Sequence, residues 1–504
     1  MLEIVSFVCG AAVMVLEMAG ARVIAPHLGT SIVVWTAIIG VILASLSLGY
    51  WLGGRAGDKN PSARKLGMII ATGAFFVLLA AITHAPLLMA VASANMPLQV
   101  SAVVAATVLF AVPAVFLGMV SPYIIQVRLL DYKDKSKTGA VMGRFFALST
   151  IGSIAGTFLG GYWLISWLGT RIILYCVAAV LAGAAALVMP RGRKVPGAAV
   201  LALALGLGGY AAVSDARNLT TGIDRDTRYN HLRIRNGAMD GRAMRFLITD
   251  PGSVQSGMLI TEPDTLALDY TKHYAIAWHI RPDASKYLML GGGGYSVPKH
   301  LMRTKPEAKI DVVEIDPGVT QASRDFFALK DGPGLRIFHE DARVFLNRAA
   351  HEAGKAETPE TYHIIMGDTF SSSYNIPFHL GTVECAERIK ALLDDDGVFA
   401  CNIISAVTGD LGQVLRGIRA AFAQVFPQVR VYPITYPHQP GVIQNVMLVA
   451  LKTPKPIPLA WDSDVAAMLA KEYTQALPDD VPPLTDDFAP VERYAMPMLR
   501  ARHM

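Results

Sequence analysis

The first 213 residues are dominated by apolar runs that are long enough to cross a lipid bilayer. A membrane-spanning helix needs about 20 consecutive, predominantly apolar residues. Seven runs approach or reach that length, at residues 4–25, 31–53, 66–85, 99–125, 145–168, 172–190 and 196–213. The composition agrees, because 53% of the 504 residues are apolar and only 17% are charged, against roughly 25% charged residues in an average soluble domain. The sequence therefore predicts a transmembrane helical domain over residues 1–213.

Basic residues concentrate in alternate loops between these runs. The basic loops contain Arg55, Lys59, Arg64, Lys65, Arg128, Lys133, Lys135, Lys137, Arg144, Arg191, Arg193 and Lys194. Because lysine and arginine favour the cytoplasmic side of a membrane protein, we expect these loops and the amino terminus to lie in the cytoplasm. The run 196–213 has only 18 residues, is rich in alanine and glycine, and has charges at both ends. We expect this run to be tilted, re-entrant or packed against the other helices, rather than to cross.

Two of the predicted helices carry glycine at every fourth position. These glycines are Gly49, Gly53 and Gly57 in the second helix, and Gly152, Gly156 and Gly160 in the fifth. Glycines on one stripe let two helix backbones approach closely in lipid. We therefore expect both stripes to be helix–helix contacts.

The second half of the chain is organised around residues 286–316, which read as strand, glycine turn, helix and strand. A short apolar run leads directly into Gly291–Gly294, and a second buried strand, residues 310–313, ends at Glu314. Only glycine lets the backbone turn this tightly and still approach a nucleotide-like ligand closely. An acid about 20 residues after such a loop can accept hydrogen bonds from ribose hydroxyls. A dinucleotide fold is disfavoured, because Ser296 stands at the third glycine of the G-x-G-x-x-G pattern.

Two further predicted strands end in acidic residues. Residues 335–339 lead to Asp341, and residues 362–366 lead to Asp368. The carboxyl ends of parallel strands meet at the crevice of an open α/β sheet, so Glu314, Asp341 and Asp368 should converge there. The sequence therefore predicts a Rossmann-like α/β domain with a nucleoside site, similar in pattern to enzymes that use S-adenosylmethionine.

At these positions the stretch from about residue 246 to residue 452 resembles the spermidine synthase (aminopropyltransferase) family. The family's glycine loop, Val-Glu-Ile-Asp motif, Asp-Ala pair and catalytic aspartate stand here as Gly291–Ser296, Val313–Asp316, Asp341-Ala342 and Asp368. Residues 376–380 and 484–490 are similar to the branch of the family that carries an N-terminal multi-span membrane domain.

The resemblance implies a polytopic α-helical membrane domain fused to a small β-subdomain and a Rossmann-like α/β, spermidine synthase-like domain. We expect a transmembrane domain at 1–213, a linker and small β-subdomain at 214–262, a nucleoside-binding catalytic domain at 263–452 and a carboxy-terminal tail at 453–504. Residues 429–434 and 442–451 should complete the sheet as an antiparallel pair.

The resemblance also implies roles for individual residues. Asp368 would be the catalytic residue, with S-adenosylmethionine or its decarboxylated form as the substrate and no prosthetic group. The nucleoside would be bound by Gln255, Gly291, Gly292, Gly293, Glu314 and Asp341. The substrate tail or the amine would be bound by Tyr270, Gly294, Ser371 and Tyr374. We expect no metal site, because the four cysteines are scattered without C-x-x-C spacing.

Two departures from the family pattern leave the reaction open. Gly294 and Ser371 stand where the family has aspartates that meet the donor ammonium and the acceptor amine. One function is aminopropyl transfer to a polyamine, with release of methylthioadenosine. A second is a lyase reaction, in which the carboxylate of S-adenosylmethionine displaces methylthioadenosine and gives homoserine lactone. A third is a transporter or sensor that only binds a nucleoside or polyamine. A methyltransferase is disfavoured by the set Gln255, Tyr270 and Asp368.

The charge distribution indicates the partners and the location. The net charge is +5, and most of the excess lies in loops of the first half, so no nucleic-acid partner is indicated. We expect the partners to be the lipid bilayer, a small-molecule nucleoside and a polyamine, and the sequence leaves a homo-oligomer open. S-adenosylmethionine is made from ATP in the cytosol, which favours six crossings over seven. We therefore expect a multi-pass protein of the cell (inner or plasma) membrane with its catalytic domain in the cytoplasm.

Overall fold

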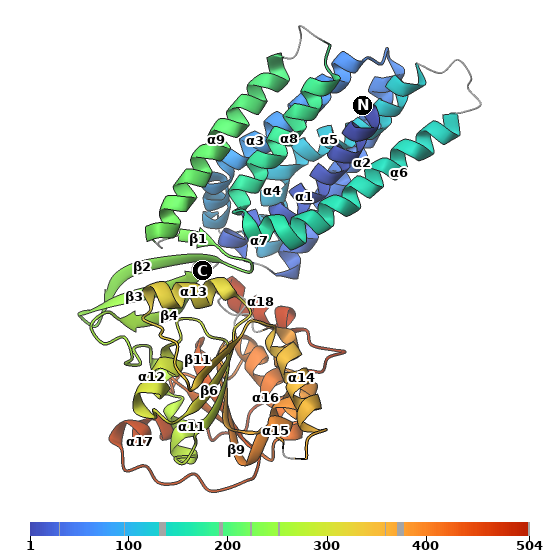
Figure 1. Cartoon of the computed structure of the whole chain (residues 1–504). Helices are drawn as coiled ribbons and strands as arrows, with labels where there is room; N and C mark the ends of the chain where they lie inside the picture. Colours follow the sequence, from blue (N-terminus) through green and yellow to red (C-terminus); the bar gives the residue numbers. More distant parts are fainter. Residues whose placement is uncertain are drawn as a thin grey trace. The chain divides into compact units, whose positions relative to one another are not determined.

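The computed structural model describes residues 1–29, 31–94, 96–130, 138–190, 195–221, 224–249, 253–357, 359–369 and 377–501. The chain forms two compact units, Met1–Arg228 and Tyr229–Met504 (Figure 1). The first unit is helical, and the second is built on β-sheets.

Among the described residues, six helical segments of the first unit are long and apolar enough to cross a membrane. They are α1 (Leu2–Leu28), α2 (Ile32–Asp58), α3 (Ala63–Ser93), Leu98–Leu129, Thr138–Leu164 and α8 (Thr170–Val188). The fourth segment comprises α4 (Leu98–Ala106), a π-helical turn η1 (Thr107–Ala111) and α5 (Val112–Leu129). The fifth comprises α6 (Thr138–Phe158) and a π-helical turn η3 (Leu159–Leu164), and leads into α7 (Ile165–Trp167).

The seventh predicted run lies within α9 (Val195–Thr221), and β1 (Asp224–Asp226) follows it near the end of this unit. The described apolar part of α9 is Gly197–Ala211. That the seventh run does not cross the membrane stays a prediction.

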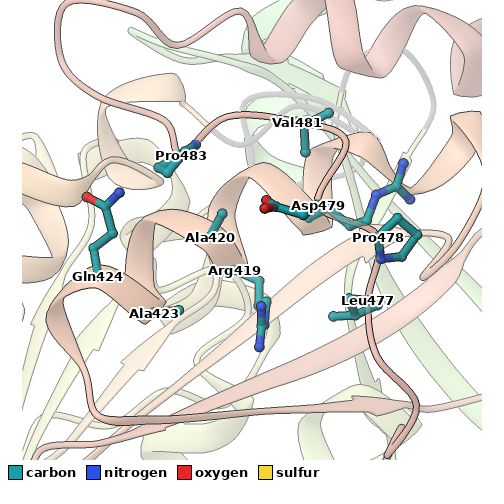
Figure 2. Close-up of a pocket in the computed structure, with 10 residues that line it drawn as sticks. Arg419, Ala420, Ala423, Gln424, Leu477, Pro478, Asp479, Val481 and Pro483 are labelled. Carbon is teal, nitrogen blue, oxygen red and sulfur yellow. The ribbon is translucent and has the colours of Figure 1, made fainter.

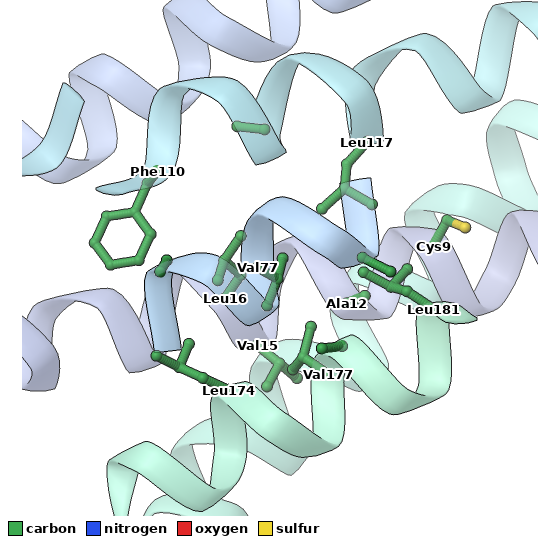
Figure 3. Packing of buried hydrophobic residues seen from close by; sticks show 14 of the residues in the cluster. Cys9, Ala12, Val15, Leu16, Val77, Phe110, Leu117, Leu174, Val177 and Leu181 are labelled. Carbon is green, nitrogen blue, oxygen red and sulfur yellow. The ribbon is translucent and has the colours of Figure 1, made fainter. Parts of the chain in front are cut away.

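Buried apolar side chains from several helices fill the interior of the first unit. Leu16 of α1, Val77 of α3, Phe110 of η1 and Val177 of α8 belong to one cluster (Figure 3). Because lipid is as apolar as these side chains, helix association in a bilayer depends on close packing rather than on the hydrophobic effect.

The predicted glycine stripes are helix–helix contacts. A Cβ atom at Gly53 of α2 would lie 2.5 Å from the carbonyl oxygen of Met119 in α5. A Cβ atom at Gly156 of α6 would lie 2.7 Å from Cα of Ala11 in α1. Gly49 and Gly152 meet backbone atoms of the same two partner helices in the same way. The prediction is confirmed at these four positions.

Gly53→Leu is expected to destabilise the first unit, because the new side chain would meet the backbone of α5, which cannot rotate away. The expected cost is about 1–3 kcal/mol or more, measured as a lower thermal midpoint of the full chain in detergent. Gly54→Leu is the matched control, since nothing lies within 4 Å of a Cβ atom at the next position of the same helix. Equal midpoints for the two variants would contradict the packing assignment.

Three antiparallel strands form a meander at the start of the second unit. They are β2 (His231–Met239), β3 (Arg242–Thr249) and β4 (Ser253–Leu259). The pairing of β3 with β4 is irregular, because Leu247 pairs with Ser256 whereas Ile248 pairs with Val254. Gln255 is therefore the extra residue of a β-bulge, a feature that re-aims a side chain.

A seven-stranded sheet forms the centre of the second unit. Its strands are β5 (Lys286–Leu290), β6 (Lys309–Val313), β7 (Leu335–Phe338), β8 (Tyr362–Gly367), β9 (Leu393–Ser405), β10 (Gln428–Pro433) and β11 (Gln444–Leu451). The spatial order is β10-β11-β9-β8-β5-β6-β7. Strands β5 to β9 run parallel, and β11 is antiparallel to both β9 and β10. The predicted antiparallel pair is confirmed, and the sheet is mixed.

Helices cover both faces of this sheet. They are α10 (Asp269–Lys272), α11 (Ala275–Ile280), α12 (Ser296–Thr304), α13 (Pro317–Phe326), α14 (Ala342–Ala353), α15 (Val383–Leu392), α16 (Gln413–Val425), α17 (Ser463–Leu469) and α18 (Val491–Ala501), with 3-10 turns η4 (Phe378–Leu380) and η5 (Asp410–Gly412). In Figure 1, α14, α15 and α16 lie on one side of the sheet, and α11, α12 and α17 lie on the other. Alternate residues of β5 serve the two cores, with Leu288 and Leu290 in one and Tyr287 and Met289 in the other. This alternation is the period of a strand buried on both faces.

Candidate active site

The candidate site lies where the strand order reverses, at β5, which has β6 on one side and β8 on the other. In open α/β sheets, ligands bind in the crevice at the carboxyl ends of the strands that flank such a point. Gly291 follows β5, and Asp368 follows β8. The backbone N–H of Asp368 donates to the carbonyl of Leu290 at 2.8 Å, so the two strand ends are joined directly.

Two glycines of the loop after β5 have backbone conformations that other residues rarely adopt. Gly291 has φ +92° and Gly293 has φ +49°. A Cβ atom at Gly291 would also collide with the carbonyl oxygen of Asp368. Glycine at position 291 is thus required both for the turn and for the contact with the end of β8.

Side chains from three other elements hold this loop in place. Glu314 accepts hydrogen bonds from the N–H groups of Gly292 and Gly293, at 2.9 and 3.3 Å. The Ser256 hydroxyl accepts from Gly294 N–H at 2.8 Å. The Ser323 hydroxyl donates to the carbonyl of Gly293 at 2.7 Å. The loop is therefore a preorganised surface rather than a mobile turn.

Glu314 is buried at the end of β6, as the sequence predicted for an acid after the second strand. Its carboxylate also accepts a hydrogen bond from Asp316 N–H at 2.9 Å. Burial raises the pKa of Glu314, and the backbone N–H donors partly oppose that shift. A carboxylate has about four lone-pair positions, so Glu314 can hold the loop and still accept from a ligand.

Asp368 is half-buried at the end of β8. The side-chain amide of Asn402, in β9, donates to its Oδ1 atom at 3.2 Å. The surrounding protein desolvates the carboxylate and raises the pKa of Asp368 to about 6, while hydrogen bonds with Asn402 and Tyr270 act in the opposite direction. A carboxyl with a pKa of about 6 can exchange protons near neutral pH, as a general base must.

Two tyrosine hydroxyls lie around the end of β8. Tyr270 donates to the carbonyl of Gln255 at 3.1 Å, and Tyr274 donates to the carbonyl of Gly367 at 2.7 Å. Burial raises the pKa of Tyr270, and the nearby charge of Asp368 raises it further. Tyr270, the bulged residue Gln255 and Asp368 therefore lie together, although they come from three separate parts of the sequence.

Asp341 caps the amino terminus of α14. One oxygen accepts from the N–H groups of Arg343 and Val344, at 2.8 and 3.2 Å. The other oxygen lies 3.4 Å from Nε2 of His379. The interaction with His379 lowers the pKa of Asp341. The helix cap uses one carboxylate oxygen of Asp341, so the second oxygen is the one that can accept a hydrogen bond from an adenine amino group.

The remaining amine-pocket predictions concern Gly294, Ser371 and Tyr374. Ser371 and Tyr374 lie outside the residues that the structure describes. A Cβ atom at Gly294 would meet Cβ of Ser256 at 2.8 Å and the Phe327 ring at 3.3 Å. The role of Gly294 in the substrate-tail pocket stays a prediction.

Sequence reasoning missed four polar residues that support this site: Ser256, Ser323, Asn402 and Asn445. Asn402 could have been noticed, because it interrupts the apolar run of residues 398–404, whereas Asn445 follows Gln444 at the start of its strand. A buried amide needs hydrogen-bond partners, so an asparagine in such a run indicates a polar neighbour.

The segment similar to the membrane-fused branch, residues 484–490, packs beside Asp341. Asp486 accepts from the Arg343 guanidinium at 2.5 Å and from the Thr382 hydroxyl at 2.8 Å. Arg343 also donates to the carbonyl of His379 at 2.8 Å. Leu484 and side chains of α18 belong to the same core as α14 and α15. Residues 484–501 thus form part of the folded second unit.

Asp486→Asn is expected to destabilise the second unit, because Arg343 is only 12% exposed and would lose its charged partner. The expected cost is about 1–2 kcal/mol, below the roughly 3–5 kcal/mol of a fully buried pair, since Asp486 is itself 43% exposed. A lower thermal midpoint would be the measurement. Asp487→Asn is the matched control at the next, exposed position. Equal midpoints for both variants would contradict this role.

A separate hollow of about 400 Å³ lies between α16 and the segment Leu477–Pro483 (Figure 2). It contains none of the predicted site residues. Among the residues that the structure describes, no group of three or more His, Cys, Asp or Glu side chains could hold a metal ion.

Comparisons with known proteins point to the same region. Residues 272–456 match the family model of the spermine/spermidine synthase domain. A polyamine aminopropyltransferase of Vibrio vulnificus is 37% identical over 124 residues, which cover 25% of this chain and 39% of the relative. A human eEF1A lysine and N-terminal methyltransferase is 27% identical over 144 residues, which cover 28% of this chain and 20% of the relative. The chain therefore spans less than two thirds of the length of either relative.

Among solved structures, a probable spermidine synthase from Corynebacterium glutamicum is 20% identical, with a TM-score of 0.41, and the match covers 51% of this chain and 88% of that one. The family match covers β5 to β11, including the glycine loop, Glu314, Asp341 and Asp368. Together with the observed mixed sheet, this match confirms the predicted Rossmann-like, spermidine synthase-like fold. Residues 272–456 are therefore similar to the spermine/spermidine synthase domain, whereas the rest of the chain lies outside the match.

Proposed function

We propose that this chain is an integral membrane, spermidine synthase-like transferase. It binds S-adenosylmethionine or the decarboxylated form and releases 5′-methylthioadenosine; from the decarboxylated donor it transfers an aminopropyl group to a polyamine. The observation that carries the proposal is Asp368, a half-buried carboxyl with a pKa of about 6 that lies beside the glycine loop and Tyr270. The proposal also draws on the relatives that are named polyamine aminopropyltransferases.

The reaction forms a C–N bond and breaks a C–S bond. The neutral amine of the acceptor attacks the methylene carbon next to the sulfonium, and the electron pair of the C–S bond goes to sulfur. Methylthioadenosine leaves, and the new secondary ammonium gives one proton to Asp368. Most of the catalysis lies in holding the amine in line with the carbon. The Asp368 carboxylate orients the amine, takes the proton and stabilises positive charge beside the sulfonium.

The nucleoside would lie along the carboxyl ends of β5 to β8. Glu314 would accept from the ribose hydroxyls and Asp341 from the adenine amino group, while Gly291–Gly293 let the backbone approach the ligand. Tyr270 would line the amine side, next to Asp368, and the bulged Gln255 would contact the nucleoside. This arrangement needs no prosthetic group, because the sulfonium supplies the leaving group.

The nucleoside product tests the proposal. Purified full chain, incubated with putrescine or spermidine and one donor, should release methylthioadenosine together with an alkylated amine. The amine gains an aminopropyl group from decarboxylated S-adenosylmethionine, or an aminocarboxypropyl group from S-adenosylmethionine itself. Release of S-adenosylhomocysteine would indicate a methyltransferase instead. Methylthioadenosine with homoserine lactone, and no amine product, would indicate the lyase. Binding without any product would favour the transporter or sensor function.

We also infer that the first unit spans the cell membrane six times and that the second unit lies in the cytoplasm. Ser93, at the end of α3, should then lie outside, because the loop after α3 is one of those without basic residues. Asp395, which is fully exposed in the second unit, should lie inside. An impermeant thiol reagent on intact cells should label Ser93→Cys and spare Asp395→Cys, with the parent chain as the background control. Labelling of Asp395→Cys from outside would contradict the orientation.

A further inference from the structure

Two asparagine side chains form a hydrogen-bonded chain that ends on Asp368. Asn445, in β11, donates from Nδ2 to Oδ1 of Asn402 at 3.0 Å. Asn402, in β9, donates from Nδ2 to Oδ1 of Asp368 at 3.2 Å. Strands β11 and β9 are antiparallel neighbours, and Asn402 is only 2% exposed. The buried Asn402 thus connects Asp368 to Asn445, a residue that does not itself contact the reacting groups in the proposed reaction.

An asparagine side chain has a donor end and an acceptor end, and only one of them can face Asp368. The amide of Asn402 could place either its NH₂ group or its carbonyl oxygen toward the carboxylate. Because Asn445 offers an N–H to the oxygen of Asn402, the NH₂ group of Asn402 is left for Asp368. The opposite orientation would set an oxygen against the oxygen of an ionised carboxylate, with no hydrogen between them.

We propose that Asn445 is a positioning residue that acts through Asn402: it fixes the orientation of the Asn402 amide, so that Asp368 always meets a hydrogen-bond donor and stays ionised for catalysis. The inference rests on the proposed role of Asp368 as the base. A donor directed at a carboxylate stabilises its charged form, and this effect counters the burial of Asp368.

Of the other titratable groups near Asp368, Tyr270 also lowers the pKa of Asp368 through a hydrogen bond, but by less than Asn402 does. Tyr270 and Tyr274, from the helical segment before β5, and Cys401, from β9, each interact with Asp368. Burial raises the pKa of all three groups above its ordinary value, so they are uncharged near neutral pH. Tyr270 also gives its hydroxyl hydrogen to the carbonyl of Gln255. Asn402 is therefore the stronger of the two donors to Asp368, and its orientation depends on a second side chain.

The test compares rate–pH profiles of the full chain with three variants. Asn402→Leu removes the donor. Asn445→Leu leaves the Asn402 amide free to turn, and Asn445→Asp offers an acceptor that draws the NH₂ group of Asn402 away from Asp368. In wild type, kcat should fall on the acidic side of the pH profile, its acid limb, as Asp368 is protonated. We expect this fall to occur about one pH unit or more higher in Asn402→Leu and Asn445→Asp, and with a smaller shift in Asn445→Leu. One unit corresponds to a roughly tenfold lower rate below the limb, with a rate near that of wild type restored at about pH 9.

Gln321→Leu is a control on α13, where the amide donates to the exposed Asp325. It should leave the profile unchanged. Thermal midpoints show whether each variant is folded. The inference would be overturned if Asn445→Asp and Asn402→Leu fold but their acid limbs lie at the same pH as in wild type. It would also be overturned if these variants lose the same fraction of the rate at every pH, because a purely structural role has that effect.

Failure of the proposed function can be recognised separately. If wild type releases no methylthioadenosine, the ionisation of Asp368 can still be followed by carbon-13 NMR of the full chain, with the resonance assigned by its loss in Asp368→Asn. Titration at a higher pH in Asn445→Leu than in wild type would support the positioning role without any turnover, because this variant adds no charge near Asp368. Titration at the same pH would overturn that role.

Discussion

Asp368→Asn should abolish release of methylthioadenosine while leaving nucleoside affinity largely intact. The amide keeps the shape of the side chain at the end of β8 but cannot accept the amine proton, and general-base catalysis contributes about 10²–10⁴-fold to a rate. Single-turnover rates and titration with methylthioadenosine measure the two effects separately. In wild type, the rate should fall as the pH drops below about 6, because protonation of Asp368 removes the base. Turnover of the variant within a few-fold of wild type would refute the assignment.

Asp368→Asn should not lower the thermal stability of the chain. A stability measurement therefore shows whether a loss of activity comes from unfolding. The pKa of Asp368 is raised from 3.8 to about 6 by burial. The stability that follows from keeping this carboxyl protonated is fully present below about pH 4 and is lost as the pH rises through about 6. Above that range the ionised carboxylate destabilises the folded chain. The thermal midpoint of Asp368→Asn should therefore equal or exceed that of wild type at about pH 8, and the difference should shrink toward pH 4. A variant with lower stability at pH 8 would leave loss of fold as the cause of inactivity.

The acidic strand ends could be predicted from the sequence because each is a local pattern. An apolar run of strand length followed by glycine or an acid identifies Gly291, Glu314 and Asp368 without any knowledge of their neighbours. The topology of a parallel sheet then brings those strand ends to one edge. The order β10-β11-β9-β8-β5-β6-β7 has this effect, with Gly291 and Asp368 in direct contact across β5 and β8.

The supporting residues could not be predicted in this way, because their partners are distant in the sequence. Asn445 reaches Asp368 only through Asn402, and both contacts depend on the register of the antiparallel pair β9–β11. Gln255 is indicated by the family resemblance alone, because it lies at a β-bulge, a single-residue irregularity that no apolar periodicity reveals. Asp486 shows the same limit, since the proline-rich stretch before it resembles a loose tail, whereas its partners are Arg343 and Thr382.

Glu314→Ala should weaken binding of methylthioadenosine by about tenfold to a hundredfold. Backbone N–H groups occupy three of the lone-pair positions of Glu314, so one charge-assisted hydrogen bond to a ribose hydroxyl would be lost. Such a bond contributes about 1.5–3 kcal/mol, and every 1.4 kcal/mol is about a tenfold change in Kd. Calorimetric titration of the full chain measures the change. An unchanged Kd would mean that the ribose lies elsewhere.

Glu314→Ala would also remove the hydrogen bonds that Glu314 accepts from the N–H groups of Gly292 and Gly293. A changed conformation of the glycine loop would then weaken ligand binding as well. A change in the ligand separates the two causes. Wild type should bind the 2′-deoxy analogue of methylthioadenosine more weakly than methylthioadenosine itself, since one hydroxyl partner of Glu314 is missing. Glu314→Ala should bind the two ligands equally, because the variant has no carboxylate to detect the hydroxyl. A coupling energy near zero in this cycle would assign Glu314 to the loop alone, and a coupling of the size of one charged hydrogen bond would assign it to the ribose.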